Sequence, residues 1–360
     1  MINVTKTFLP PFEEYTALLK QSWDRTWITN NGPLVVELEE KLKAYLDVKN
    51  LWLCNNGTSV LQMAIKGLDI TGDVITTAFS YVATTTALLW ENCNPVYVDI
   101  HEENFCIDSS KIEARINSAT QAILVTHVYG YPCDVETISS IAKKHKLWII
   151  YDGAHAFGTK FKGRSLLSFG DISTCSFHAT KLFHTVEGGC IVANDDELSQ
   201  KLLHYRQFGH KEDEYFSIGI NAKNSEMHAA MGLCNLKYID QIKLSRKKQW
   251  LYYRSLLDGS NLKFLHVEED VDYNYAYFPI VFPSEADLLI AMKALIKNGI
   301  IPRRYFYPAL NRLPYIAYQS CPIAESIANR ILCLPLFFDL PEKEQELVCD
   351  IILVLQKQKS

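Results

Sequence analysis

The sequence predicts an α/β fold in which a mostly parallel central sheet lies between helices and a smaller C-terminal α+β domain follows. From about residue 45 to 195, short β-branched and apolar runs alternate with longer segments whose apolar residues recur every three or four positions. After residue 235 the alternation gives way to one long helical pattern and a shorter set of strands and helices. The alternation between residues 45 and 195 is typical of parallel strands whose connecting helices cover both faces of the sheet.

The expected strands of the central sheet are the segments 50–54, 73–78, 95–100, 121–128, 146–152, 171–177 and 189–194. Helical spacing of apolar residues marks three of the intervening segments, which are 58–68, 82–90 and 135–146. Their order along the chain fits a doubly wound arrangement.

The C-terminal part begins with a long helical pattern at 237–257. A strand-like run at 273–282 and a helical run at 285–299 follow it. We therefore expect a large domain over residues 31–240 and a small domain over 241–360. The proline-broken segment 1–30 is too short for a domain, and we expect it to pack on the C-terminal part or on a partner subunit.

Composition excludes several classes of protein. Of 360 residues, 48% are hydrophobic and 21% are charged, as in an ordinary globular chain. A net charge of -5 provides no field to gather nucleic acid. No apolar run approaches the roughly 18 residues that span a bilayer, and the first residues lack the pattern of a leader, so the cytoplasm is expected. The ten cysteines contain no CxxC pair, which argues against a metal site and favours core thiols in a reducing compartment.

The segment NNGTS at 55–59 follows the first expected strand and opens a helical run. Free backbone amides of Gly57, Thr58 and Ser59 at such a helix start can bind an anion such as a phosphate. A plain helix N-cap is the alternative interpretation of the same residues. The pattern is neither GxGxxG nor a Walker loop, which disfavours a dinucleotide or ATP site.

Asp152 ends the expected strand at 146–152 and so lies at the carboxyl edge of the sheet, where open α/β folds bind ligands. It is a candidate functional acid. In the alternative interpretation, Asp152 caps a following helix and His155 is a partly buried histidine with satisfied partners.

Lys181 lies between Phe177 and Phe183 in the segment SFHATKLFHTVEGG. An apolar setting lowers the pKa of an amine, and a neutral amine is the nucleophile that condenses with an aldehyde. A surface lysine after a strand is the alternative. An anion-binding helix start, a strand-end aspartate and this lysine are together the parts that bind pyridoxal 5'-phosphate (PLP), since they provide a phosphate grip, a pyridinium partner and a Schiff-base lysine.

Nearly the whole chain resembles the DegT/DnrJ-type sugar-nucleotide aminotransferases, which are PLP enzymes of fold type I. The resemblance is carried by the segments WITNNGPLVVELEEKLKAYLDV, NNGTSVLQMAIKGL, THVYGYPCD, YDGAHAFG, SFHATKLFHTVEGG, RQFGH and GINAKNSEMHAAMGL. It departs from many members in having His155 where they have Gln, and Lys223-Asn224 where they have Arg-Met.

The resemblance implies roles for individual residues. Those implied for PLP are Lys181 as the Schiff-base lysine, Asp152 at the pyridine nitrogen, His155 near the phenolic oxygen, Tyr81 over the ring face, and Gly57, Thr58 and Ser176 at the phosphate. Asn221 would reach the phosphate from the neighbouring subunit. A homodimer with active sites at the subunit interface is therefore implied.

The resemblance also implies the reaction, which is transfer of an amino group from L-glutamate to a nucleotide-linked keto sugar. The segments VTKTFLPPFEEY, WITNNGP and SFHATK are most similar to members that aminate C4 of a dTDP-linked 4-keto-6-deoxyhexose for O-antigen or other surface glycans. A 3-keto sugar or a UDP-linked sugar is the alternative. Candidates to line the mouth for the nucleotide diphosphate are Arg303, Arg304, Tyr305 and Tyr307, because arginine matches phosphate oxygens with a planar fork. A solvated loop is the other interpretation of these four residues.

Two further functions compete with an aminotransferase. PLP-dependent sugar dehydratases of this fold carry His in place of the Schiff-base lysine, so Lys181 argues against that activity. A regulator that keeps the fold without turnover is disfavoured by the intact set of Lys181, Asp152 and the phosphate residues.

Overall fold

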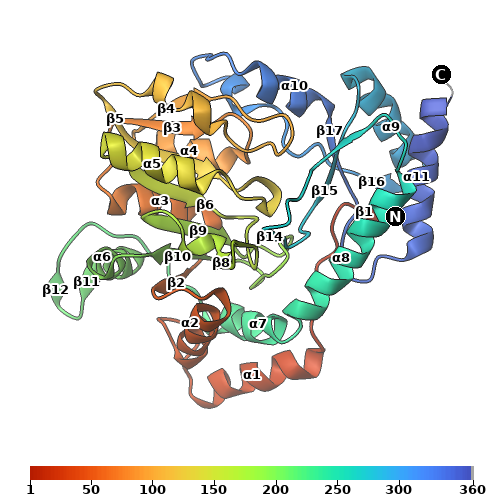
Figure 1. Ribbon diagram of the computed structural model, residues 1–360. Helices are drawn as coiled ribbons and strands as arrows, with labels where there is room; N and C mark the ends of the chain where they lie inside the picture. Colours follow the sequence, from red (N-terminus) through yellow and green to blue (C-terminus); the bar gives the residue numbers. More distant parts are fainter. Residues whose placement is uncertain (358–360) are drawn as a thin grey trace.

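Seven strands form the central sheet of this computed structural model, which describes residues 1–357 (Figure 1). Their order across the sheet is β2-β10-β9-β6-β5-β3-β4. Each strand expected in the central sheet is present: β2 (Leu51–Cys54), β3 (Asp73–Thr77), β4 (Asn94–Val98), β5 (Thr120–Thr126), β6 (Trp148–Asp152), β9 (Ile172–Ser176) and β10 (Gly189–Ala193). Only β10 runs antiparallel to its neighbours, so the mostly parallel sheet is confirmed.

Both faces of this sheet are buried, which explains why its strands read as continuous apolar runs. Along β5, Ile123 and Val125 belong to one hydrophobic cluster, whereas Ala122 and Leu124 face another on the opposite side. The helices of this part of the chain are α2 (Pro33–Leu46), α3 (Gly57–Gly67), α4 (Val82–Trp90), α5 (Val135–His145), α6 (Asp196–Arg206) and α7 (Glu226–Leu236).

Glu226 at the start of α7 caps the start of α2. Its carboxylate, which is fully buried, accepts hydrogen bonds from the amides of Leu34 at 3.0 Å and Val35 at 2.9 Å. A Cβ atom at Gly32 would lie 2.6 Å from Cδ of Glu226, so the glycine of WITNNGP is required for this contact. The cap fixes the segment before α2 against α7.

The C-terminal part contains a three-stranded antiparallel sheet in the order β13-β15-β17. Its elements are α8 (Ile239–Leu256), β13 (Lys263–Phe264), β15 (Phe278–Val281), α9 (Glu285–Lys297), β16 (Ile300–Ile301), α10 (Pro322–Arg330), β17 (Ile331–Leu334) and α11 (Glu342–Lys357). The strand expected at 273–282 is shorter than predicted, because the regular pairing begins only at Phe278. The domain boundary near residue 240 is still a proposal.

Three further pairings join short strands outside the two sheets described above. β14 (Val271–Asp272) pairs with β7 (Lys160–Phe161), which also pairs with β8 (Arg164–Ser165). A hairpin is formed by β11 (His210–Lys211) and β12 (Glu214–Tyr215).

The N-terminal segment contacts both parts of the chain. β1 (Ile2–Asn3) pairs in parallel with β16, as expected for packing on the C-terminal part. By contrast, α1 (Phe12–Asp24) packs against α7, where the hydroxyl group of Tyr15 donates to the carbonyl of Met227 at 3.3 Å. The segment is therefore not confined to the C-terminal part.

All ten cysteines are buried free thiols, which confirms their interpretation as core residues. Within residues 1–357, no helix combines the length and the apolar character needed to cross a bilayer.

Candidate active site

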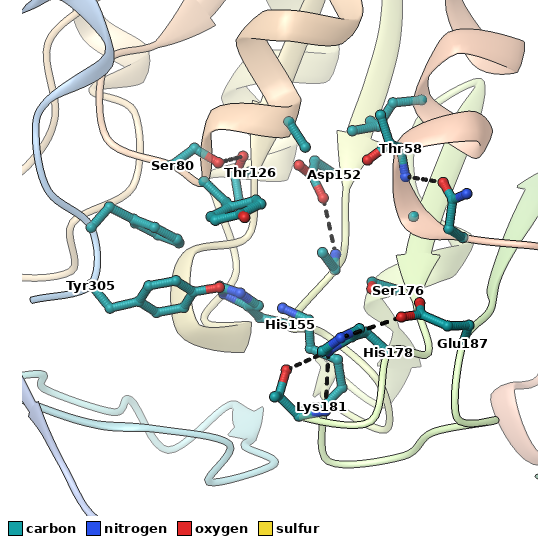
Figure 2. A pocket seen from close by; sticks show the side chains of 18 of the residues that line it. Thr58, Ser80, Thr126, Asp152, His155, Ser176, His178, Lys181, Glu187 and Tyr305 are labelled. Carbon is teal, nitrogen blue, oxygen red and sulfur yellow. Dashed lines mark hydrogen bonds and ion pairs between the residues drawn. The ribbon is translucent and has the colours of Figure 1, made fainter. Parts of the chain in front are cut away.

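A pocket of about 230 Å³ opens at the carboxyl edge of the central sheet, where β2, β6 and β9 all end (Figure 2). Its walls bring together most of the residues predicted for the site, namely Gly57, Thr58, Tyr81, Asp152, His155, Ser176, Lys181, Arg303 and Tyr305. These positions are spread over almost 250 residues of sequence. Their convergence follows from the parallel strands, whose carboxyl ends meet at one edge.

Asp152 is the last residue of β6 and is almost completely buried. Burial raises the pKa of its carboxyl group, while hydrogen bonds from the hydroxyl of Thr84 at 2.7 Å and the amide of Ala154 at 3.1 Å, together with the charge of Lys181, act to lower it. A buried carboxylate held in this way is most stable beside a cation, which a protonated pyridine nitrogen supplies.

Lys181 follows β9 in a loop whose aromatic residues are packed together. Phe183 stacks on Phe157 at a centroid distance of 4.4 Å, and Phe177 meets Phe183 edge-on at 5.0 Å. Burial lowers the pKa of Lys181 to about 8, although the charge of Asp152 opposes this shift. The amine is therefore available as a neutral nucleophile near physiological pH.

His155 is a neutral imidazole with a defined tautomer. Its Nδ1 atom accepts a hydrogen bond from the amide of Tyr129 at 3.2 Å, so the ring proton is on Nε2. Burial keeps the pKa of His155 well below its ordinary value. Nε2 has no hydrogen-bond partner among the described residues, and the phenolic oxygen of PLP is an acceptor that would satisfy it.

The predicted phosphate grip is smaller than the sequence suggested. The side chain of Asn56 caps α3 and accepts hydrogen bonds from the amides of Thr58 at 3.0 Å and Ser59 at 2.8 Å. The N-cap alternative is therefore observed, and two of the three proposed amides are occupied. The amide of Gly57 and the hydroxyl groups of Thr58 and Ser176 are the groups that fit a phosphate at this place in the pocket.

Three predicted residues do not line this pocket. Asn221 is exposed and accepts a hydrogen bond from Lys223 at 2.8 Å, so it does not contribute to the site of its own chain. Arg304 is turned toward Glu285, with an ion pair of 2.8 Å, and lies over the ring of Tyr307. Packing of this loop on α9 thus removes Arg304 and Tyr307 from the pocket wall, contrary to their expected place at the mouth.

Sequence reasoning missed three residues on the open side of the pocket. His178 is 2.8 Å from the hydroxyl of Thr180 and 3.5 Å from the carboxylate of Glu187. Figure 2 shows His178 and Glu187 next to each other beside Lys181. All three lie within six residues of Lys181, and their polar character in that segment was the signal that could have identified them.

A doubly wound sheet with a lysine of lowered pKa and a strand-end aspartate in one pocket fits the class of fold type I PLP enzymes. The chain belongs to the DegT/DnrJ/EryC1/StrS aminotransferase family, whose model matches residues 12–353. It is thus a PLP-dependent sugar aminotransferase.

Individual relatives are similar over almost their whole length. The dTDP-4-amino-4,6-dideoxy-D-glucose transaminase of Shigella dysenteriae is 39% identical, over 98% of this chain and 98% of that protein. The GDP-perosamine synthase of Escherichia coli O157:H7 is 34% identical, over 91% of this chain and 92% of its own length. The solved structure of DesI in the presence of its TDP-sugar product matches with a TM-score of 0.94 at 28% identity, covering 99% of this chain and 94% of DesI.

Proposed function

We propose that this enzyme transfers an amino group from L-glutamate to dTDP-4-keto-6-deoxyglucose and so forms dTDP-4-amino-4,6-dideoxyglucose for O-antigen or another surface glycan. The observation that carries the proposal is the pocket that holds the amine of Lys181 and the carboxylate of Asp152 together. The similarity to the Shigella transaminase over nearly the full length supports this choice of sugar.

In this proposal Lys181 carries PLP, which when bound supplies an electron sink for the substrate carbon. Once the amino group of the substrate has displaced it, the neutral amine of Lys181 would accept the proton from the substrate carbon and hold it for return. Asp152 remains ionised and keeps the ring nitrogen protonated, which is stabilisation by a fixed opposite charge. The Nε2 proton of His155, which has no partner among the described residues, would be available to the phenolic oxygen.

The rest of the site binds and orients. Gly57, Thr58 and Ser176 are proposed to hold the phosphate, and Tyr81 is proposed to cover the ring face. Tyr81 is 48% exposed and its ring lies 6.2 Å from that of Tyr305, so it stands at the open side of the pocket.

Arg303 and Tyr305 are the proposed contacts for the sugar nucleotide. The guanidinium group of Arg303 lies 4.6 Å from the centre of the Tyr305 ring, and both residues line the pocket. A planar cation in this position can pair with diphosphate oxygens. Arg304 and Tyr307 are not part of this proposal, because neither lines the pocket.

A homodimer is part of the proposal, with Asn221 reaching the phosphate in the neighbouring site. The segment around β11 and β12 exposes a group of large apolar side chains, which are Phe208, Tyr215, Phe216, Ile218 and Ile220. A cluster of this kind supports burial against a second copy. The free thiols support a reducing compartment, and we place the enzyme in the cytoplasm.

The test begins with the purified protein, PLP and L-glutamate, followed through the visible absorption of the bound cofactor. dTDP-4-keto-6-deoxyglucose is then added, and the product is identified by mass and NMR. Bleaching with glutamate and formation of a 4-amino sugar are expected. A product aminated at C3, or turnover only with a UDP- or GDP-linked sugar, would replace the substrate proposed here. Absence of a protein-bound absorption band would contradict the role of Lys181.

A further inference from the structure

Tyr277 lies beside Lys181, although it comes from the C-terminal part, 96 residues further along the chain. Its hydroxyl oxygen is 3.5 Å from Nζ of Lys181 and accepts a hydrogen bond from that amine. Within residues 1–357, this is the one hydrogen bond that the side chain of Lys181 makes. Tyr277 is buried and does not line the pocket. The hydroxyl group therefore reaches the lysine from inside the protein rather than from the open side of the site.

The phenol ring of Tyr277 is held on several sides. It is surrounded by three other rings, at centroid distances of 4.6 Å for His155, 5.5 Å for Tyr305 and 5.6 Å for Tyr129. The backbone before it is fixed as well, because Arg246 donates a hydrogen bond to the carbonyl of Ala276 at 2.9 Å. Burial holds the pKa of Tyr277 well above its ordinary value, so the hydroxyl group keeps its proton and can both donate and accept.

The proposed role of Lys181 requires its amine to alternate between a covalent bond to the cofactor and a free state. A free lysine has a long flexible side chain, and a misplacement of about 1 Å can cost on the order of 100-fold in rate. We propose that Tyr277 is a positioning residue for Lys181, whose hydroxyl group holds the free amine at the place from which it reacts. This inference rests on the proposed role of Lys181 and adds a residue from outside the pocket wall.

The experiment measures capture of PLP by the full-length apoprotein. Wild type and Tyr277→Phe are mixed with PLP alone, and the covalent bond is followed by absorption and, after borohydride reduction, by mass spectrometry of the Lys181 peptide. The variant keeps the ring packing and loses one oxygen atom. We expect its capture rate to fall at least about tenfold, because the amine is no longer held.

Tyr253→Phe is the matched control. Tyr253 is also buried in the C-terminal part, but its hydroxyl group has no hydrogen-bond partner among the described residues. Removing this oxygen is expected to leave the capture rate unchanged. Thermal unfolding of both variants verifies that they fold as the wild type does.

A double variant distinguishes the loss of lysine positioning from damage to the pocket. Tyr277→Phe is combined with Lys181→Ala, and non-covalent PLP affinity is compared with that of Lys181→Ala alone. Equal affinities are expected if Tyr277 acts through the lysine. The proposal would be overturned if Tyr277→Phe captured PLP at the wild-type rate. It would also be overturned if adding Tyr277→Phe to Lys181→Ala lowered the affinity for PLP.

The outcome does not depend on the sugar, since neither donor nor sugar is present in the capture experiment. A wrong assignment of the sugar substrate therefore leaves this result intact. Covalent capture by Lys181→Ala itself would show that another amine binds PLP, and the proposal for Tyr277 would fall with the role of Lys181.

Discussion

The hydroxyl group of Thr84 in α4 donates a hydrogen bond of 2.7 Å to Oδ2 of Asp152 at the end of β6. Ser80 extends this contact, because its hydroxyl oxygen is 2.7 Å from those of both Thr84 and Thr126. The three hydroxyl groups form a connected network on one side of the carboxylate. They orient Asp152 and favour its ionised form, against the effect of burial.

Thr84→Val should therefore weaken the action of Asp152, the proposed partner of the ring nitrogen, without removing its carboxylate. The substitution keeps the shape of the side chain but deletes the hydrogen bond to Asp152. We expect the glutamate half-reaction to slow about tenfold and the free energy of unfolding to fall by about 1–3 kcal/mol, measured by cofactor absorption and urea unfolding. Thr86→Val on the same helix is the control, since its hydroxyl bonds only to backbone carbonyls within α4. Equal effects of the two substitutions would contradict the role of Thr84.

The pH dependence of PLP capture should report the amine of Lys181. Burial lowers its pKa to about 8, and only the neutral amine attacks the aldehyde. The capture rate of the apoprotein is expected to rise with pH, with a midpoint near pH 8, and to level off about one pH unit above it. Stopped-flow absorption between pH 6 and 10 provides the test. A capture rate that still rises tenfold per pH unit between pH 8 and 9, as an ordinary lysine pKa of about 10.4 requires, would show that Lys181 is solvated.

Gly57→Ala should weaken binding of the phosphate group. A Cβ atom at this position would lie 2.9 Å from Cβ of Ser176, so α3 and β9 must separate at the proposed phosphate site. We expect the affinity for PLP to fall about tenfold, which corresponds to about 1.4 kcal/mol. Pyridoxal, which lacks the phosphate, is the matched ligand and should bind both proteins equally. A parallel loss for pyridoxal would place the defect elsewhere in the pocket.

Glu39 and Arg206 form a buried ion pair that holds both backbone groups of Leu53 in the edge strand β2. The amide of Leu53 donates to Glu39 at 2.9 Å, and Arg206 donates to the carbonyl of Leu53 at 2.8 Å. Arg206→Met leaves the carboxylate buried without its partner, and we expect it to cost about 3–5 kcal/mol in urea unfolding.

The double variant Glu39→Leu/Arg206→Met should recover part of that stability, because no unpaired charge remains. PLP affinity should fall in the single variant, since β2 leads directly into the turn before Gly57. If Arg206→Met lowered the free energy of unfolding by less than about 1 kcal/mol, the ion pair would not be what holds β2 in place.

The sequence predicted those residues of the site that lie close, along the chain, to the strand that positions them. Asp152 directly follows an apolar run, and Lys181 lies between two phenylalanines, so neighbours along the chain already indicate a strand end and an apolar setting. His178 and Glu187 belong to the same segment as Lys181, and their polar character was the one local signal for a place in the site. The resemblance to a family added roles for Tyr81, Ser176 and Asn221, which no local pattern indicates.

Other contacts had no signal in the sequence. Arg303 and Arg304 are adjacent and chemically alike, yet only Arg303 lines the pocket, because Arg304 pairs with Glu285 of α9. Similarly, the turn before α3 is consistent with both an anion site and an N-cap until the side chain of Asn56 is placed.

By itself, the sequence predicted the order of strands and helices along the chain and the strand end at which Asp152 lies, and it singled out Lys181 as the amine proposed to react. These features depend on periodicity and on residues adjacent along the chain. Only the tertiary structure decided that Thr84, 68 residues before Asp152, orients that carboxylate, and that Tyr277, 96 residues after Lys181, touches its amine. The physical reason is that such contacts arise where helices and the C-terminal part pack on the sheet edge, and that packing brings together side chains no local pattern connects.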